Sequence, residues 1–146
     1  MENTMEISIS SVVAAPLQLV WLAYTSPEHI KVWNTASSDW HTTLASVDLR
    51  VGGRFSSRME AKDGSFGFDF AGEYTNVVTE HLIEYVFGDR VGRVSFDKTN
   101  AGVNVTVMFD SESSHSVDQQ RSGWQAILDN FARYTEALST APSAQT

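Results

Sequence analysis

The stretch "RFSSRMEAKDGSFGFDFAGEY", residues 54–74, has the pattern of two strands joined by a tight turn. At its centre stands Asp63-Gly64, a dipeptide that strongly favours a two-residue β-hairpin loop. A loop at this point fixes which residues of the two strands face each other, because the register of a hairpin follows from its turn. The predicted partners are Phe55 with Gly72, Ser57 with Phe70, Met59 with Phe68, Arg58 with Asp69 and Arg54 with Glu73.

This register separates charged residues from apolar ones. Alternate side chains of a strand point to opposite faces, so both pairs of opposite charge lie on one face. The same register predicts that Gly53 lies opposite Tyr74 and leaves room for its ring. A shift of one residue would mix the two faces, which favours this register. The opposite face collects Phe55, Ser57, Met59, Phe66, Phe68, Phe70 and Tyr74.

The aromatic face has two interpretations. A filled core is the commoner outcome for any single residue, since each buried Phe contributes roughly 1.5–3 kcal/mol. The face also carries the hydroxyls of Ser57 and Tyr74, and of Tyr85 if its strand faces the same way. An apolar surface with a few convergent polar groups is typical of a small-molecule pocket. Gly123 poses the same choice between close packing against a strand and open space beside Trp124.

Two short helices are predicted between the first strand and the hairpin. Residues 6–13 alternate in polarity and are rich in β-branched side chains, which predicts a strand. Pro16 suits the first turn of a helix. Ser26 followed by Pro27 suits the start of a second helix, which we expect to end near Trp33.

Beyond the hairpin the chain continues as strands and then changes to helical spacing. Ser116 and Gln119 form a capping box, and the apolar residues after it predict a helix of about 117–138. Strands joined by short turns are antiparallel and can bury one face, for which this helix is the only large partner. The predicted fold class is therefore α+β, a curved antiparallel sheet around a long C-terminal α-helix. We expect a single domain at 1–138 and a disordered tail at 139–146.

Composition argues against several classes of protein. The net charge of -8 disfavours nucleic acid as a partner, because binding to phosphates needs clustered Lys and Arg. The chain has no cysteine, and its histidines show no metal-ligand spacing, so we predict no metal and no cofactor. His41 is the one histidine expected near a pocket mouth.

The sequence also predicts neither a signal peptide nor a membrane span. The first ten residues lack the basic start and apolar run of a signal peptide. The most apolar segment is too short to span a bilayer, so we predict no membrane span. A cytoplasmic protein is the expectation.

Several linked motifs resemble those of a known superfamily. "APLQLVWLAYTSPEHIKVWN" resembles the opening of the SRPBCC (START/Bet v 1-like) superfamily, and "DLRVGGRFSSRM" with the following "DG" and "FAGEYTNVVTEHLIEYVF" is similar to its central strands. "SGWQAILDNFARYTEAL" is similar to its closing helix. The branch named for homology to the activator of the heat shock protein 90 ATPase is the most similar.

This resemblance implies a helix-grip fold with a hydrophobic cavity between the sheet and the long helix. Members include lipid and hormone carriers, cyclases, and co-chaperone domains, some of them linked to the stress response. A single tryptophan stands at position 33, where many members have a pair. The cavity implied by the resemblance is lined by Trp33, Phe55, Met59, Phe68, Phe70, Tyr85, Trp124, Leu128 and Phe131.

Three functions follow as alternatives. The first is binding of a small hydrophobic molecule, lipid-like or aromatic, with Ser57, Tyr74 and Tyr85 orienting it. The second is a cyclase or hydrolase, which would need an acid or base in the cavity such as Glu84 or His41; we predict no catalytic residue and favour a protein that is not an enzyme. The third is an interaction module for a chaperone, which would need an exposed apolar patch.

Overall fold

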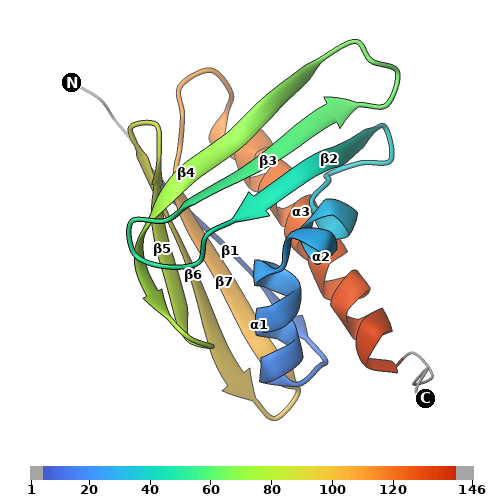
Figure 1. Ribbon diagram of the computed structural model, residues 1–146, viewed down its shortest axis with the longest axis vertical. Helices are drawn as coiled ribbons and strands as arrows, with labels where there is room; N and C mark the ends of the chain where they lie inside the picture. Colours follow the sequence, from blue (N-terminus) through green and yellow to red (C-terminus); the bar gives the residue numbers. More distant parts are fainter. Residues whose placement is uncertain (1–4, 141–146) are drawn as a thin grey trace.

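The computed structural model describes residues 5–140 as a curved sheet gripping a long helix (Figure 1). The predicted α+β helix-grip architecture is confirmed. In chain order the elements are β1 (Glu6–Val13), α1 (Leu17–Thr25), α2 (Pro27–Trp33), β2 (Trp40–Val47), β3 (Arg54–Ala61), β4 (Gly67–Val78), β5 (Leu82–Phe87), β6 (Arg90–Thr99), β7 (Gly102–Asp110) and α3 (Val117–Thr140).

The seven strands form one antiparallel sheet in the order β1-β7-β6-β5-β4-β3-β2. Every neighbour but one is also adjacent along the chain, and the exception is β1, which pairs with β7. The sheet curls so that its concave face surrounds α3, while the long hairpin of β3 and β4 extends past the helix (Figure 1). Bulges near Thr42 in β2 and near Tyr74 in β4 bend this part of the sheet.

The predicted register of the β3–β4 hairpin is confirmed at all five pairs. The loop itself is longer than two residues, because Ala61 N donates to the carbonyl oxygen of Phe66 at 2.9 Å and closes a loop of residues 62–65. A type I′ turn needs positive φ at both central residues, and Gly64 has a φ of 79° whereas Asp63 is not in that region. One residue is added on each side of the predicted loop, so the pairing is unchanged.

The charged cross-strand pairs lie on the outer face, as predicted. Arg58 and Asp69 approach to 3.6 Å, and Arg54 and Glu73 to 3.7 Å. Arg58 also contacts Glu60 of its own strand at 3.0 Å. All these side chains are substantially exposed, so their main effect is on register and solubility rather than stability.

Glycines make room for aromatic rings, but at other positions than the sequence predicted. Gly53 does pair with Tyr74, whose N donates to Gly53 O at 2.9 Å. A Cβ at Gly53 would collide with the backbone of a preceding turn, 2.0 Å from the Asp48 carbonyl oxygen, so this glycine permits a tight turn. Ring space is provided instead by Gly72, which lies under Phe55, and by Gly92, which lies under the ring of Tyr85 in β5.

Helix α3 begins at the predicted capping box. Ser116 N donates to Gln119 Oε1 at 3.1 Å, and Gln119 N donates to Ser116 Oγ at 3.0 Å. The next residue, Gln120, is buried and ties the preceding loop to the helix, since its Nε2 donates to the carbonyl oxygens of Glu112 and His115. The helix runs two residues beyond the predicted end at 138, and the rest of the expected tail, 141–146, lies outside the described residues.

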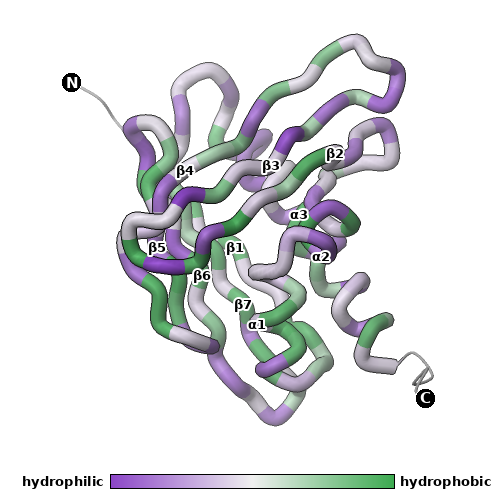
Figure 2. Tube along the Cα trace, in the orientation of Figure 1, coloured by the Kyte–Doolittle hydropathy of each residue, from purple (hydrophilic) through white to green (hydrophobic). Residues whose placement is uncertain are grey.

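The closely packed core lies where β1, β6 and β7 meet α1, α2 and the C-terminal half of α3. Phe131 and Thr135 of α3 are fully buried there, as are Val20 of α1 and Val94 of β6. Hydrophobic residues dominate α1 and the neighbouring strands, whereas the β3–β4 tip is largely hydrophilic (Figure 2). The molecule thus has one tightly packed half and one projecting arm, which is the hairpin of β3 and β4.

Candidate functional site

A cavity of about 230 Å³ lies between the concave face of the sheet and α3. Its wall combines residues of α1, α2, α3 and every strand, and apolar side chains dominate it. All but one of the residues proposed from the sequence line it, namely Trp33, Phe55, Ser57, Met59, Phe68, Phe70, Tyr74, Tyr85, Trp124 and Leu128. The exception, Phe131, is fully buried behind the cavity and packs against Trp33 with ring centroids 5.0 Å apart.

The cavity exists because α3 lies closer to one side of the sheet than to the other. The backbone of α3 closely approaches β1, α1 and α2. Strands β3 and β4 lie farther away, and the gap is bridged by aromatic side chains instead of backbone contacts. The hydrophobic face of the arm therefore surrounds a space that its rings do not fill.

Part of the cavity wall consists of aromatic rings that are held in position by contacts with one another and by a hydrogen bond. Trp124 of α3 stacks on Phe109 of β7 with centroids 3.8 Å apart and an interplanar angle of 10°. Phe70 meets the same indole edge-on at 5.9 Å. Trp33 Nε1 donates to the carbonyl oxygen of Ala23 at 2.9 Å, so that its only polar atom is satisfied and its ring supplies apolar wall.

Three tyrosines contribute the main polar groups of the wall. Tyr74 and Tyr85 were predicted, and Tyr24 from α1 joins them. Burial raises the pKa of each phenol, to about 12 for Tyr74. Charge interactions among the phenols add to this, since Tyr74 raises the pKa of Tyr24, and Tyr24 and Tyr74 raise that of Tyr85. Each of these hydroxyls can donate one hydrogen bond, and all three tyrosines line the cavity.

Sequence reasoning missed Tyr24 because α1 is hydrophobic on most of its surface. Periodicity cannot tell which face of such a short helix meets the sheet. Tyr24 packs edge-on against Phe96 and Phe131, at centroid distances of 5.7 and 5.1 Å. The only signal available was the presence of a polar aromatic residue in an otherwise apolar run.

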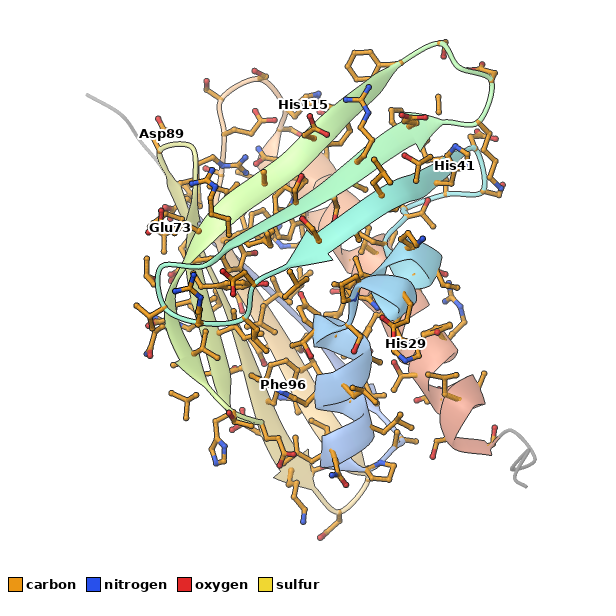
Figure 3. All side chains as sticks on the ribbon, in the orientation of Figure 1. His29, His41, Glu73, Asp89, Phe96 and His115 are labelled. Carbon is orange, nitrogen blue, oxygen red and sulfur yellow. The ribbon has the colours of Figure 1, made fainter. Side chains whose placement is uncertain are left out.

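No lining residue of this cavity carries a charged side chain among the described residues. His41 is exposed on β2, where it faces Glu60 of β3, and Figure 3 shows it near the edge of the arm. Glu84 accepts a hydrogen bond from Arg93 at 2.9 Å and another from Asn76 at 3.2 Å on the outer face. The two residues that would have supported an enzyme therefore lie outside the cavity.

A groove of about 370 Å³ adjoins the cavity between the arm and the N-terminal half of α3. The two spaces share Met59, Phe68, Trp124 and Ile127 as lining residues. Gly123 also lines the groove, and a Cβ placed on it would meet no atom within 4 Å. The choice left open by the sequence is settled here: Gly123 borders open space and is not packed against a strand.

The outer end of the aromatic row is more exposed than the alternation predicted. Phe66 is 63% exposed and Phe68 is 41% exposed, and both contact Trp40 with ring centroids about 6 Å apart. The prediction that the row faces inward fails at Phe66 because the hairpin extends past α3. None of the described helices lies opposite the tip, so its concave face meets solvent.

Taken together, a sheet gripping a helix around an apolar cavity defines a helix-grip protein of the SRPBCC class. The chain belongs to the family described as activator of Hsp90 ATPase homolog 1-like proteins, whose model matches residues 14–136. This family and fold comprise ligand-binding or co-chaperone-like proteins.

Solved structures agree with this assignment. The AHSA1-like protein from Aeromonas hydrophila is 48% identical with a TM-score of 0.87, and the match covers 92% of this chain and 94% of that chain. A protein from Cytophaga hutchinsonii is 40% identical with a TM-score of 0.76, covering 99% of this chain and 100% of that chain. No curated protein matches the chain.

Neither a membrane-spanning helix nor a metal-binding cluster occurs in the described part of the chain. No helix within residues 5–140 is both long and apolar enough to cross a bilayer. The same residues contain no group of three His, Cys, Asp or Glu side chains suited to a metal ion.

Proposed function

We propose that this protein binds a small, uncharged hydrophobic molecule in the cavity between the sheet and α3. The observation that carries the proposal is an apolar, aromatic-walled cavity that is also lined by three tyrosines, Tyr24, Tyr74 and Tyr85. Such a combination is what small-molecule sites offer, since apolar surface supplies affinity and a few polar groups supply orientation. The shape of the space between the aromatic side chains decides whether an aromatic or a lipid-like ligand fits.

The roles of the wall residues follow from their chemistry. Phe55, Phe70 and Trp124 present ring surface that a ligand would remove from water. Tyr74 and Tyr85 would donate hydrogen bonds to an oxygen of the ligand, with Ser57 beside them and Tyr24 as an added donor. Because no cationic side chain among residues 5–140 lines the cavity, a ligand with a buried carboxylate would lack a partner for its charge.

Amide chemical-shift mapping with a panel of uncharged aromatic and alkyl ketones tests the proposal. Saturable shifts are expected around Phe55, Phe70 and Trp124. Tyr85→Phe removes one donor and should weaken ketone binding about threefold to tenfold, the value of one hydrogen bond of roughly 0.5–1.5 kcal/mol. Tyr134→Phe is the matched control, since the Tyr134 hydroxyl lies outside the cavity and contacts His29 Nδ1 at 2.5 Å. Absence of shifts with every compound would refute the proposal.

An interaction module for a chaperone is a second candidate. Its supporting observation is the aromatic cluster of Trp40, Phe66 and Phe68, in which both phenylalanines are exposed. Phe66→Ser should abolish binding to a purified heat shock protein 90-type chaperone and leave ketone binding intact, because Phe66 does not line the cavity. Equal chaperone binding by the variant and the wild type would exclude this surface. The cytoplasmic location and a link to the stress response stay predictions.

A further inference from the structure

We propose that the ligand is elongated and that its apolar extension leaves the cavity along the groove over Gly123. This inference rests on the proposed function and specifies the shape of the ligand. It assigns a role to the groove and to Gly123, which binding in the cavity alone does not explain.

The groove continues the cavity instead of forming a separate depression. Phe68 and Met59 from the arm, and Trp124 and Ile127 from α3, line both spaces. A molecule whose head lies among the tyrosines therefore meets apolar wall without interruption as it passes Trp124. The continuity points to one occupant for both spaces.

Gly123 keeps this passage open. Glycine inside a helix costs about 1 kcal/mol relative to alanine, so its presence in α3 needs a reason. Close packing is not the reason, because a Cβ there would meet nothing within 4 Å. A longer side chain at this position would extend into the groove that Gly123 lines.

The polar groups around the groove are mostly occupied, which favours an uncharged extension. His115 Nδ1 lies 2.6 Å from Glu112 Oε2, and Figure 3 shows this histidine near the beginning of α3. The Gln120 amide is bonded to backbone of the preceding loop. Gln119 Oε1 accepts a hydrogen bond within the capping box. What remains for a ligand is chiefly the apolar surface of Trp40, Phe68 and Ile127.

The experiment uses phenyl alkyl ketones of increasing chain length, from acetophenone to octanophenone, titrated against the full chain by tryptophan fluorescence. For the wild type, affinity should rise about three- to fourfold with each methylene, as burial of a CH₂ predicts. Gly123→Leu should bind acetophenone like the wild type but stop gaining with longer chains, and bind octanophenone at least tenfold more weakly. Ser122→Leu, which adds the same side chain at the exposed neighbouring position, should follow the wild type.

Ser37→Phe supplies a second obstruction, from the loop between α2 and β2 that lines the groove independently of the helix. It should give the same chain-length limit as Gly123→Leu. Thermal denaturation of each variant verifies that it is folded. If both variants follow the wild type across the series, or the wild type itself stops gaining after acetophenone, the extension does not use the groove and this inference is wrong while the cavity proposal stands.

Two other results would also overturn the inference, and they differ from each other. Failure of acetophenone itself to bind would refute the cavity proposal beneath it. A wild-type dimer in analytical ultracentrifugation that dissociates on Gly123→Leu but not on Ser122→Leu would assign the groove to a second copy of the chain.

Discussion

At the scale of single residues, Gly123 and Gly72 show opposite uses of glycine. Gly123 borders open space, whereas a Cβ at Gly72 would lie 2.4 Å from the Val86 carbonyl oxygen and 2.8 Å from the Phe55 ring. We therefore expect Gly123→Ala to raise the free energy of unfolding by about 1 kcal/mol, the difference in helix propensity. Urea denaturation measures this change. Gly72→Ala is the contrast and should lower the free energy of unfolding, because its Cβ would collide with these atoms. A loss of stability in Gly123→Ala would contradict the conclusion that Gly123 borders open space.

The tyrosines give a second prediction at this scale, on pH dependence. The pKa of every tyrosine in the chain is raised, chiefly by burial, to about 12 for Tyr74. In the unfolded chain a phenol ionises near pH 10. Folding is therefore favoured fully below about pH 10, and this contribution is lost as the pH rises towards the folded pKa values.

An absorbance titration of phenolate formation, with circular dichroism in parallel, tests this. Phenolate should appear above the ordinary range and together with loss of the fold. Tyr74 has the smallest pKa shift of the three cavity phenols, so the titration of Tyr74→Phe shows which part of the wild-type curve belongs to it. Ionisation near pH 10 in a protein that keeps its native dichroism would show that the cavity is open to bulk water.

At the scale of elements, the capping box of α3 is the clearest test. Ser116→Ala removes the side-chain acceptor for Gln119 N, so the free energy of unfolding should fall by about 1 kcal/mol. Ser122→Ala, at an exposed position in the middle of the helix, is the control and should be near neutral or slightly stabilising. Equal effects of the two substitutions on the denaturation midpoint would mean that the cap adds nothing.

The same elements show what sequence alone could predict. The register of β3 and β4 was predictable because charge pairing and the Asp63-Gly64 turn gave the same answer. The start of α3 was predictable because a capping box is a local signal. The exposure of Phe66 was not, since alternation assigns a face to a side chain but not what lies opposite that face. Tyr24 was missed for the related reason that a short apolar helix has no marked face.

At the scale of the whole molecule, the packed half and the projecting arm should differ in stability. β1, β6 and β7 are rich in fully buried side chains, such as Val13, Val94 and Val105. In the β3–β4 arm, by contrast, Phe68 is 41% exposed and α3 makes few close backbone approaches. Local opening therefore costs less free energy in the arm than in the packed half. A ligand that enters the cavity through the groove would also have to pass the arm, which lines both spaces.

Amide hydrogen exchange can separate these two regions and link them to binding. Without ligand, amides of residues 54–61 and 67–72 should exchange faster than those of β7, because exchange on the scale of minutes to hours reports local opening. Saturating octanophenone should slow exchange in the arm and near Gly123 more than in β7, since a ligand that contacts arm and helix must be released before the arm opens. Uniform slowing across all strands would instead indicate global stabilisation by a ligand that leaves the arm free, and the groove would then have no part in binding.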